Sequence, residues 1–411
     1  MKFTALAVVA VAALSLSACS TASPSSPSAA SDKDPFTFVY MAGISGAQAT
    51  QAAQELQGVQ IAMDEINASG GILGRKIVLE KLDSKSDPTV AVSVLQQRLA
   101  SGTKPDLIHT AIASTEALAV TPVTTRAGIA TYAASSSILL DDPKSYPLNK
   151  LISAPTPSFV SAFKAYADAN RYKKIELLVT EDASGDSIVQ TIADLYKGSD
   201  AQIHETRYNA ADLDLSTAFQ RAAGDHPDVI FTTCQGAPCS RLVAARTSIA
   251  GGTDIPMVGD AAMSALAGGL ALESSKESLE NLHMIIFDVQ LKHPESEQTP
   301  EFKKFLSGIS SLGGTLNFSS ATSVAYDGLK MFAAAAQKAG STDAKKMVKA
   351  IDDIQWKPGD FVSYGKAALD YSSKSVFPVI PDSAFAIVQV APLVDSQYEP
   401  IDLFQPKTQK R

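Results

Sequence analysis

The feature that most constrains the fold of this chain is a regular alternation of short apolar runs with helix-like stretches. A stretch with Leu56, Val59, Met63 and Ile66 on one face is typical of an amphipathic helix. Runs of strand length fall at residues 36–42, 76–82, 106–110, 128–133, 174–180, 228–233, 255–258 and 284–288. This alternation predicts an α/β fold with mostly parallel sheets built from strand–helix–strand units.

Local signals mark further helices. Asp87-Pro88 is typical of a helix start, and we expect the helix that follows to turn Val90, Val94 and Leu99 inward. Other helices are expected at residues 187–196, 216–223 and 323–338. The chain has 411 residues, which is too many for one hydrophobic core, so two domains are expected.

The N-terminus has the pattern of a secretory signal. An apolar stretch from Ala5 to Leu16 starts near Lys2 and is too short to span a bilayer. It ends in Leu-Ser-Ala-Cys, which resembles a bacterial lipobox. That resemblance implies removal of residues 1–18, a lipid on Cys19 and a flexible tether over residues 19–35. The alternative is an ordinary signal peptide with a chance cysteine.

If the chain is exported, both its net charge and the expected state of its other two cysteines follow. The mature chain would keep 34 basic and 43 acidic residues, a net charge of −9, which argues against nucleic acid as a partner. Cys234 and Cys239 would meet an oxidising compartment, which favours a disulfide. Two free thiols are the alternative. A metal site is less favoured, because no histidine pair lies nearby at ligand spacing.

Catalytic sequence motifs are absent. The chain has no Gly-x-Ser-x-Gly, no P-loop, no His-Glu-x-x-His and no Gly-x-Gly-x-x-Gly. Triads assemble in space, so an enzyme is disfavoured rather than excluded. We expect no catalytic activity, no cofactor and no metal.

Small polar residues follow two expected strands. Ala113, Ser114 and Thr115 come after the strand at 106–110, and Ser135–Ser137 come after the strand at 128–133. Ligands of open α/β sheets bind beyond the carboxyl ends of the strands. Hydroxyls beside free backbone N–H groups suit a carboxylate. The alternative is that these residues only cap helices and form turns.

Four segments now identify a family. Asp64–Ile77, with the sequence DEINASGGILGRKI, resembles the signature of the branched-chain amino-acid-binding family, the type I solute-binding proteins of ABC importers. Asp83–Pro88, Ser323–Gly328 and Ala339–Asp343 resemble further family motifs. The resemblance implies a type I periplasmic-binding-protein fold, with two αβα lobes joined by a three-strand hinge. It places residues 36–153 and 287–368 in lobe 1, and residues 154–286 and 369–411 in lobe 2.

The resemblance also implies a ligand site. Ser45 matches the first ligand-facing loop, residues 113–115 and 135–137 match the loops that hold an α-carboxylate, and Gln235 falls in a loop of the second lobe. Asp260 falls where an acid accepts the α-ammonium group of an amino acid. In contrast, Gln51 and Ser184 stand where many members carry aromatic residues, which makes the pocket more polar and puts a Leu/Ile/Val ligand in doubt.

The resulting interpretation is a monomeric lipoprotein outside the cytoplasm, anchored through Cys19. It captures a small polar ligand, an amino acid or a related amide or carboxylate, and delivers it to an ABC permease. The rival interpretation is a ligand-sensing receptor component of a signalling system on the same fold.

Overall fold

The computed structural model describes residues 34–110, 113–234, 236–263, 277–287, 290–312, 320–392, 394 and 397–406. The expected signal peptide, Cys19 and Gln235 lie outside these residues, as does most of the expected tether. In the described part of the chain, no helix has the length and apolar character needed to cross a membrane.

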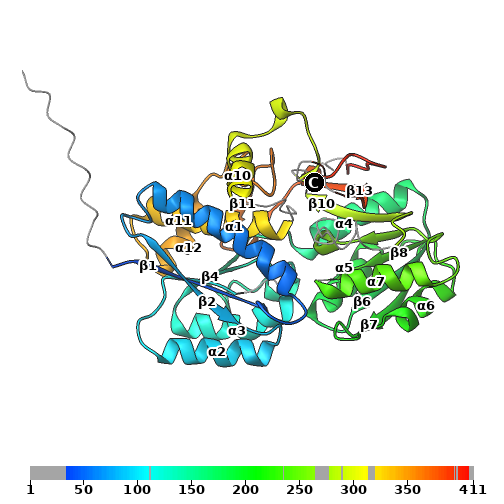
Figure 1. The fold of residues 1–411 in the computed structure, drawn as a ribbon, viewed down its shortest axis with the longest axis horizontal. Coiled ribbons are helices and arrows are strands. Elements are labelled where there is room, and N and C mark those ends of the chain that lie inside the picture. Colours follow the sequence, from blue (N-terminus) through cyan, green and yellow to red (C-terminus); the bar gives the residue numbers. More distant parts are fainter. Residues whose placement is uncertain are drawn as a thin grey trace, which may run out of the picture. The chain divides into compact units, whose positions relative to one another are not determined.

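The first lobe is built on a five-stranded parallel sheet with the order β2-β1-β3-β4-β5 (Figure 1). Its strands are β1 (Phe36–Ala42), β2 (Ile77–Asp83), β3 (Leu107–His109), β4 (Ala130–Ala133) and β5 (Asn149–Leu151). Its first helices are α1 (Ala49–Ala68), α2 (Pro88–Ala100) and α3 (Ser114–Ala127), followed by the short helix η1 (Ile138–Leu140).

The second lobe is built on a six-stranded sheet with the order β13-β10-β9-β8-β6-β7. Its strands are β6 (Lys174–Thr180), β7 (Gln202–Tyr208), β8 (Val229–Thr232), β9 (Met257–Gly259), β10 (Leu282–Phe287) and β13 (Phe385–Gln389). Its helices are α4 (Thr156–Ala169), α5 (Ala183–Leu195), α6 (Ser216–Gly224), α7 (Ala237–Ser248) and the short helix η2 (Ala261–Met263). The edge strand β13 pairs antiparallel with β10, and the other described pairs are parallel.

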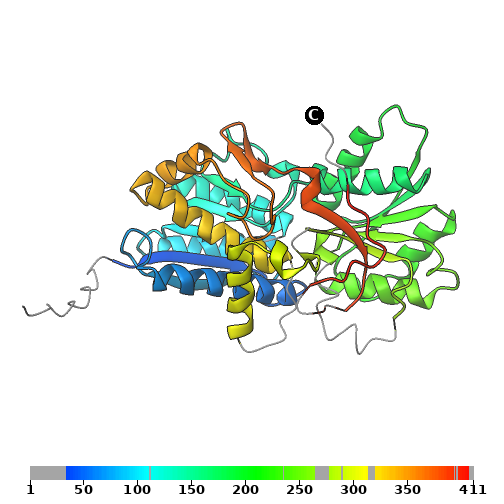
Figure 2. The ribbon, with the colours of Figure 1, turned by 90° about the horizontal axis from the view of Figure 1, so that it is seen from above.

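The chain then returns to the first lobe. The chain between β10 and β13 contains η4 (Glu295–Glu297), α10 (Pro300–Ser311), α11 (Ser320–Ala339), α12 (Ala344–Asp353), β11 (Asp370–Ser372), β12 (Ser375–Val379) and, at the last crossover, η5 (Asp382–Ala384). Helix α11 packs so closely on α1 that a Cβ atom on Gly58 would lie 1.9 Å from the carbonyl oxygen of Thr322. These two parts of the lobe are far apart in sequence but lie side by side (Figures 1 and 2).

The last crossover lies later than the expected boundary at 368/369. The Tyr371 hydroxyl donates to the carbonyl of Leu151, and Lys150 forms an ion pair with Asp352 at 2.5 Å and donates to the carbonyl of Ser372. These contacts hold β11 on the first lobe. The chain therefore reaches the second lobe between β12 and β13, and the other two crossovers follow β5 and β10.

One local expectation needs correction. In α2, Ala91 and Leu95 are fully buried, whereas Val90, Val94 and Leu99 are only partly buried, so the inward face is shifted by one residue. In the second lobe, α7 begins at Ala237 with Pro238 in its first turn. Proline is favoured at that position because the first helical N–H groups have no partner inside the helix.

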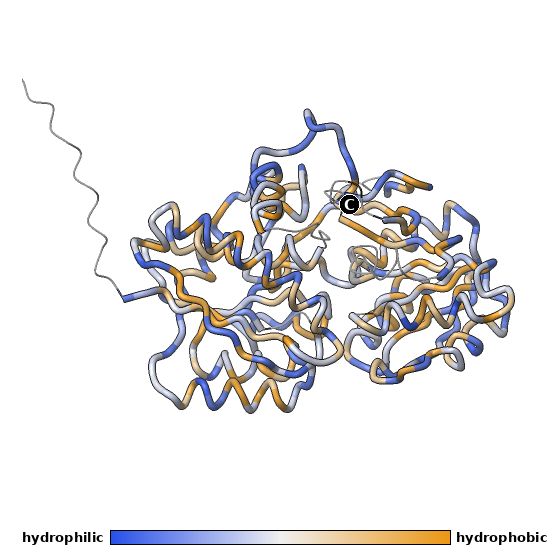
Figure 3. The backbone as a smooth tube through the Cα atoms, viewed as in Figure 1, coloured by the Kyte–Doolittle hydropathy of each residue, from blue (hydrophilic) through white to orange (hydrophobic). Residues whose placement is uncertain are grey.

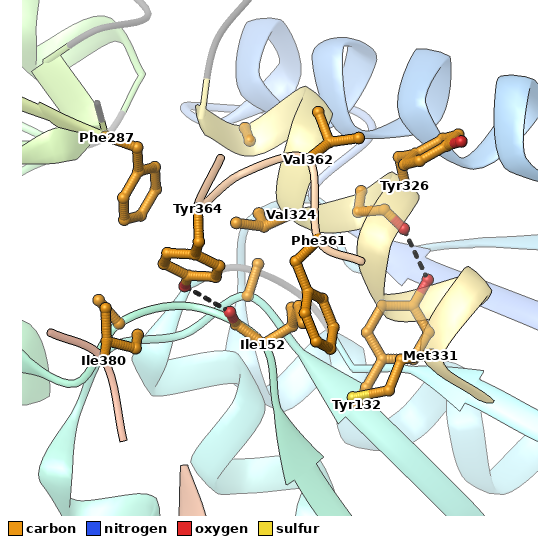
Figure 4. Packing of buried hydrophobic residues seen from close by; sticks show 14 of the residues in the cluster. Tyr132, Ile152, Phe287, Val324, Tyr326, Met331, Phe361, Val362, Tyr364 and Ile380 are labelled. Carbon is orange, nitrogen blue, oxygen red and sulfur yellow. Dashed lines mark hydrogen bonds between the residues drawn. The ribbon is translucent and has the colours of Figure 1, made fainter. Parts of the chain in front are cut away.

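Apolar sequence concentrates on the central strands of both sheets (Figure 3). A buried cluster continues across the crossovers. There the ring of Phe287, at the end of β10, packs edge-on against the ring of Tyr364, with 5.0 Å between the ring centroids (Figure 4). The Tyr364 hydroxyl donates to the carbonyl of Ile152 at 2.6 Å. One packed cluster therefore joins two of the crossovers to the first lobe.

Candidate functional site

A cavity lies at the carboxyl ends of the strands of both lobes. Its empty volume is about 510 Å³, including space open to solvent. It is lined by Gln51, Ser114, Ala134, Ser136, Ser153, Phe159, Ser184, Asp260, Ala261, Phe287, Ser320, Ala321 and Val324. A larger hollow beside α12, of about 1520 Å³, is lined by the first lobe alone. The cavity at the strand ends, which residues of both lobes line, is therefore the candidate ligand site.

The first lobe supplies a wall of serine hydroxyls. Ser114 opens α3, and its Oγ lies 2.9 Å from Oγ of the buried Ser135. Ser136, beyond β4, lies with its Oγ 3.0 Å from Oγ of Ser153. The start of α3 adds backbone N–H groups and the positive end of the helix dipole. This wall can donate several hydrogen bonds to an anionic or carbonyl group.

The second lobe supplies a carboxylate. Asp260 follows β9, is 6% exposed and accepts a 2.5 Å hydrogen bond from Oγ1 of Thr233. The pKa of the Tyr208 hydroxyl is raised, first by burial and second by the nearby charge of Asp260. This hydroxyl therefore keeps its proton and donates a hydrogen bond to the carbonyl of Thr233 at 2.7 Å. Among the described lining residues, Asp260 is the only one with an ionisable side chain. The described cavity wall therefore favours a ligand that carries a cationic or N–H-rich group.

Gln51 and Ser184, the two positions at which the resemblance implied a departure from aromatic residues, both line the cavity. Ser184 lies in the first turn of α5, where its N–H donates to the capping carboxylate of Asp182 at 2.9 Å. Gln51 lies in the first turn of α1 and is 2% exposed. Phe159 and Phe287 supply aromatic surface from other elements. The cavity is thus a mixture of polar groups and two phenyl rings.

A buried acidic cluster lies beneath this end of α1. Glu55, one turn after Gln51, is fully buried; its Oε2 accepts from the Tyr40 hydroxyl at 3.0 Å and its Oε1 lies 3.5 Å from Nε2 of His109. Glu116 of α3 is also fully buried, and burial raises the pKa of its carboxyl. The groups around Glu55 thus come from β1 and β3 as well as α3, and they tie α1 to the sheet.

Of the expected site residues that the structure describes, Ser45, Ala113, Thr115, Ser135 and Ser137 are not among those that line the cavity. Ser45 is exposed, and its hydroxyl donates to Oδ2 of Asp83 at 2.7 Å. Ala113 is the N-cap residue of α3, Thr115 is partly buried in its first turn, and Ser137 caps η1 by accepting from the N–H of Leu139. These residues shape the loops whose neighbours reach the cavity.

Cys234 and Cys239 are linked by a disulfide, and both are buried. The bridge joins the end of β8 to the first turn of α7. The N–H of Ala237, inside this turn, donates at 3.2 Å to the carbonyl of Ala47 on the first lobe. The disulfide-linked turn therefore lies at a contact between the lobes.

Other hydrogen bonds also join the lobes near the cavity. The N–H of Ile138 donates to Oγ of Ser187 at 3.2 Å, and the Ser320 hydroxyl donates to the carbonyl of Ala261 at 3.2 Å. The lobes are therefore in contact at several places on the rim of the cavity. Most of these positions carry no local sequence signal, because residues from distant segments meet only in the folded chain.

A family model described as periplasmic binding protein matches residues 36–370. The chain belongs to this family, which confirms the resemblance seen in the sequence. Members of this family bind solutes outside the cytoplasm. In the described residues, no group of three or more His, Cys, Asp or Glu side chains is arranged to hold a metal ion.

Curated relatives match over short segments. The Leu/Ile/Val-binding protein BraC3 of Rhizobium johnstonii is 39% identical over 66 residues, which is 16% of this chain and 18% of that protein. The Leu/Ile/Val/Thr-binding protein of Salmonella typhimurium is 35% identical over 83 residues, or 20% of this chain and 23% of that protein. The chain thus matches about a fifth of the length of these relatives.

Solved structures match over most of the chain. A type 1 periplasmic binding protein of Bordetella pertussis superposes with a TM-score of 0.73 at 17% identity, covering 86% of this chain and 96% of that one. An R. palustris ABC-transporter solute-binding protein in complex with 4-hydroxybenzoate gives a TM-score of 0.73 at 17% identity, covering 92% and 96%. The branched-chain amino-acid transporter substrate-binding protein of Streptococcus pneumoniae, in complex with isoleucine, gives a TM-score of 0.69 at 20% identity. The match covers 90% of this chain and 100% of that one. These likenesses show the fold.

Proposed function

We propose that this chain is a lipid-anchored solute-binding protein that captures a small amine-bearing polar molecule and delivers it to an ABC permease. The observation that carries the proposal is the composition of the cavity. Asp260 in the second lobe and the serine wall of the first lobe, with Ser114 and Ser136, line the same space. A carboxylate and a set of hydroxyl and N–H donors match the two polar ends of an amino acid or a related amide.

The mechanism follows from the division of this site between lobes. A ligand that contacts Asp260 and the serine wall together gains both interactions only while the lobes are in contact. Binding therefore favours the closed arrangement by the difference in affinity between the closed and open forms. A permease that recognises the closed protein would accept only a loaded one. No reaction is part of this cycle.

The test is calorimetry on a ligand found by a thermal-shift screen of amino acids, amides and aromatic acids. A ligand at 100 times its Kd should stabilise the protein by about 2.7 kcal/mol. A hydrogen bond to a charged group is worth about 1.5–3 kcal/mol, so Asp260→Asn should weaken binding roughly ten- to a hundredfold.

The matched control is Asp194→Asn, on the exposed face of α5 in the same lobe. It makes the same chemical change outside the cavity and should bind like the wild type. Equal affinity of Asp260→Asn and the wild type would remove the amine-bearing ligand from the proposal.

A further inference from the structure

The Gln51 amide is a buried polar group without a partner. Gln51 is 2% exposed and lines the cavity, and its Oε1 is sealed from solvent. Within the described part of the chain, no hydrogen bond engages its carbonyl oxygen or its amide nitrogen. Burying an amide without hydrogen bonds is costly, and most such groups in folded proteins find a partner.

The neighbours of Gln51 on its own helix do not supply that partner. Glu55, one turn further along α1, directs its carboxylate to Tyr40 and His109. Its backbone neighbour Ala52 accepts from the Tyr40 hydroxyl at 2.8 Å. Because Gln51 lines the cavity, a ligand of the proposed function is the group best placed to pair with its amide, which can turn to present either its nitrogen or its oxygen.

A primary amide specifies the kind of group that can satisfy it. It offers two N–H donors and a carbonyl acceptor on one planar unit. A carboxamide, a ureido group or a hydroxyl can both donate and accept, so each can pair with it in either orientation of the amide. A hydrocarbon side chain can do neither and would leave the amide buried and unpaired.

We propose that Gln51 determines the specificity of this site for amine-bearing solutes whose other end is a neutral group that both donates and accepts hydrogen bonds. In amino-acid terms, these are compounds with amide, ureido or hydroxyl side chains rather than branched hydrocarbons. This inference rests on the proposed function, which supplies the amine-binding Asp260. It assigns to Gln51 the choice between polar and apolar ligands.

The experiment compares affinities by calorimetry for two sets of probes. The polar set is glutamine, asparagine, citrulline and threonine, and the apolar set is leucine, isoleucine and valine. Sites built to hydrogen-bond a polar group discriminate strongly against analogues that lack it. The wild type should therefore bind at least one polar probe about tenfold or more tightly than any apolar probe. Gln51→Leu should abolish or reverse that preference.

Gln51→Met serves as a second variant of similar length, and it should give the same result if Gln51→Leu does not fold. The matched control is Gln60→Leu, which makes the same change two turns further along α1, where the side chain bonds to Asp64 outside the cavity. It should keep the wild-type preference.

The outcomes separate two failures. An unchanged ratio of polar to apolar affinity in both Gln51 variants overturns the inference about Gln51 and leaves the amine-binding proposal in place. A wild type that binds no probe of either set overturns the proposed ligand class and this inference with it.

Discussion

Gly236 allows a close approach of the second lobe to Ala47 of the first lobe, so its replacement by alanine is expected to weaken ligand binding from outside the cavity. Its φ of 68° and ψ of −134° are disfavoured for residues with a side chain. A Cβ atom at this position would lie 2.4 Å from the carbonyl oxygen of Ala47 on the first lobe. That is roughly 1 Å closer than a comfortable van der Waals contact. The lobes would have to separate at this point of the rim.

The magnitude follows from two losses in the closed arrangement. The Ala237–Ala47 hydrogen bond is worth about 0.5–1.5 kcal/mol net, and the overlap adds a penalty of similar size. A closed form destabilised by about 1–3 kcal/mol lowers ligand affinity by about 5- to 150-fold. The backbone strain at Gly236 acts on open and closed forms alike, so it should lower the melting temperature without changing affinity.

Gly198→Ala is the matched control, because Gly198 has a φ of 79° and its Cβ would meet nothing within 4 Å. Calorimetry should give the wild-type Kd for Gly198→Ala and a weaker one for Gly236→Ala, while both variants melt at lower temperature. A Gly236→Ala protein that binds within twofold of the wild type would refute the idea that closure presses this turn against Ala47.

Two further predictions concern pH and anchoring. Burial raises the pKa of Asp327 to about 7, against the opposing effect of N–H donors from Val362 and Ser363. The folded state therefore holds this proton more tightly than the unfolded chain, so stability should fall as pH rises from about 4 to about 7. Urea unfolding should show that the free energy of unfolding falls more between about pH 5 and about pH 8 for the wild type than for Asp327→Asn. Equal falls in the two proteins would contradict this role of Asp327. Cys19→Ala should release the protein from membranes in cell fractionation; retention would argue against the lipid anchor.

The parallel framework of both lobes could be predicted from the sequence, because its central strands are buried on both faces and read as apolar runs. The edge strand β7 could not, since it carries exposed charged and polar residues such as Glu205 and is buried only at Tyr208. The start of α7 was hidden by Gly236 and Pro238, which are turn formers in isolation. The late crossover was invisible because β11 is held by tertiary contacts to Lys150 and Leu151.

Some residues of the candidate site could likewise be predicted from the sequence, and others could not. Ser114, Ser136 and Asp260 could be placed near the cavity because each follows a strand whose carboxyl end borders it. Their binding roles stay predictions. Phe287 and Ser320 carried no signal, since they reach the cavity only through the crossovers and the packing of α11 on α1. Ser45 follows a strand end as well, but its hydroxyl is engaged by Asp83.

The position of Ser45 points to a wider role for the turn that leads into α1. Ser45 bonds to Asp83, and the N–H of Gln48 donates to Oγ of Ser86 at 3.1 Å, so the turn is fixed to its own lobe from two sides. Within it, Ala47 touches the second lobe, and one helical turn later Gln51 enters the cavity. The proposed ligand contact and the observed lobe contact therefore lie on the same segment of the chain. In the proposed mechanism, a ligand that pairs with Gln51 would bring the second lobe toward the turn that presents Ala47, so recognition and closure would occur together at this end of α1.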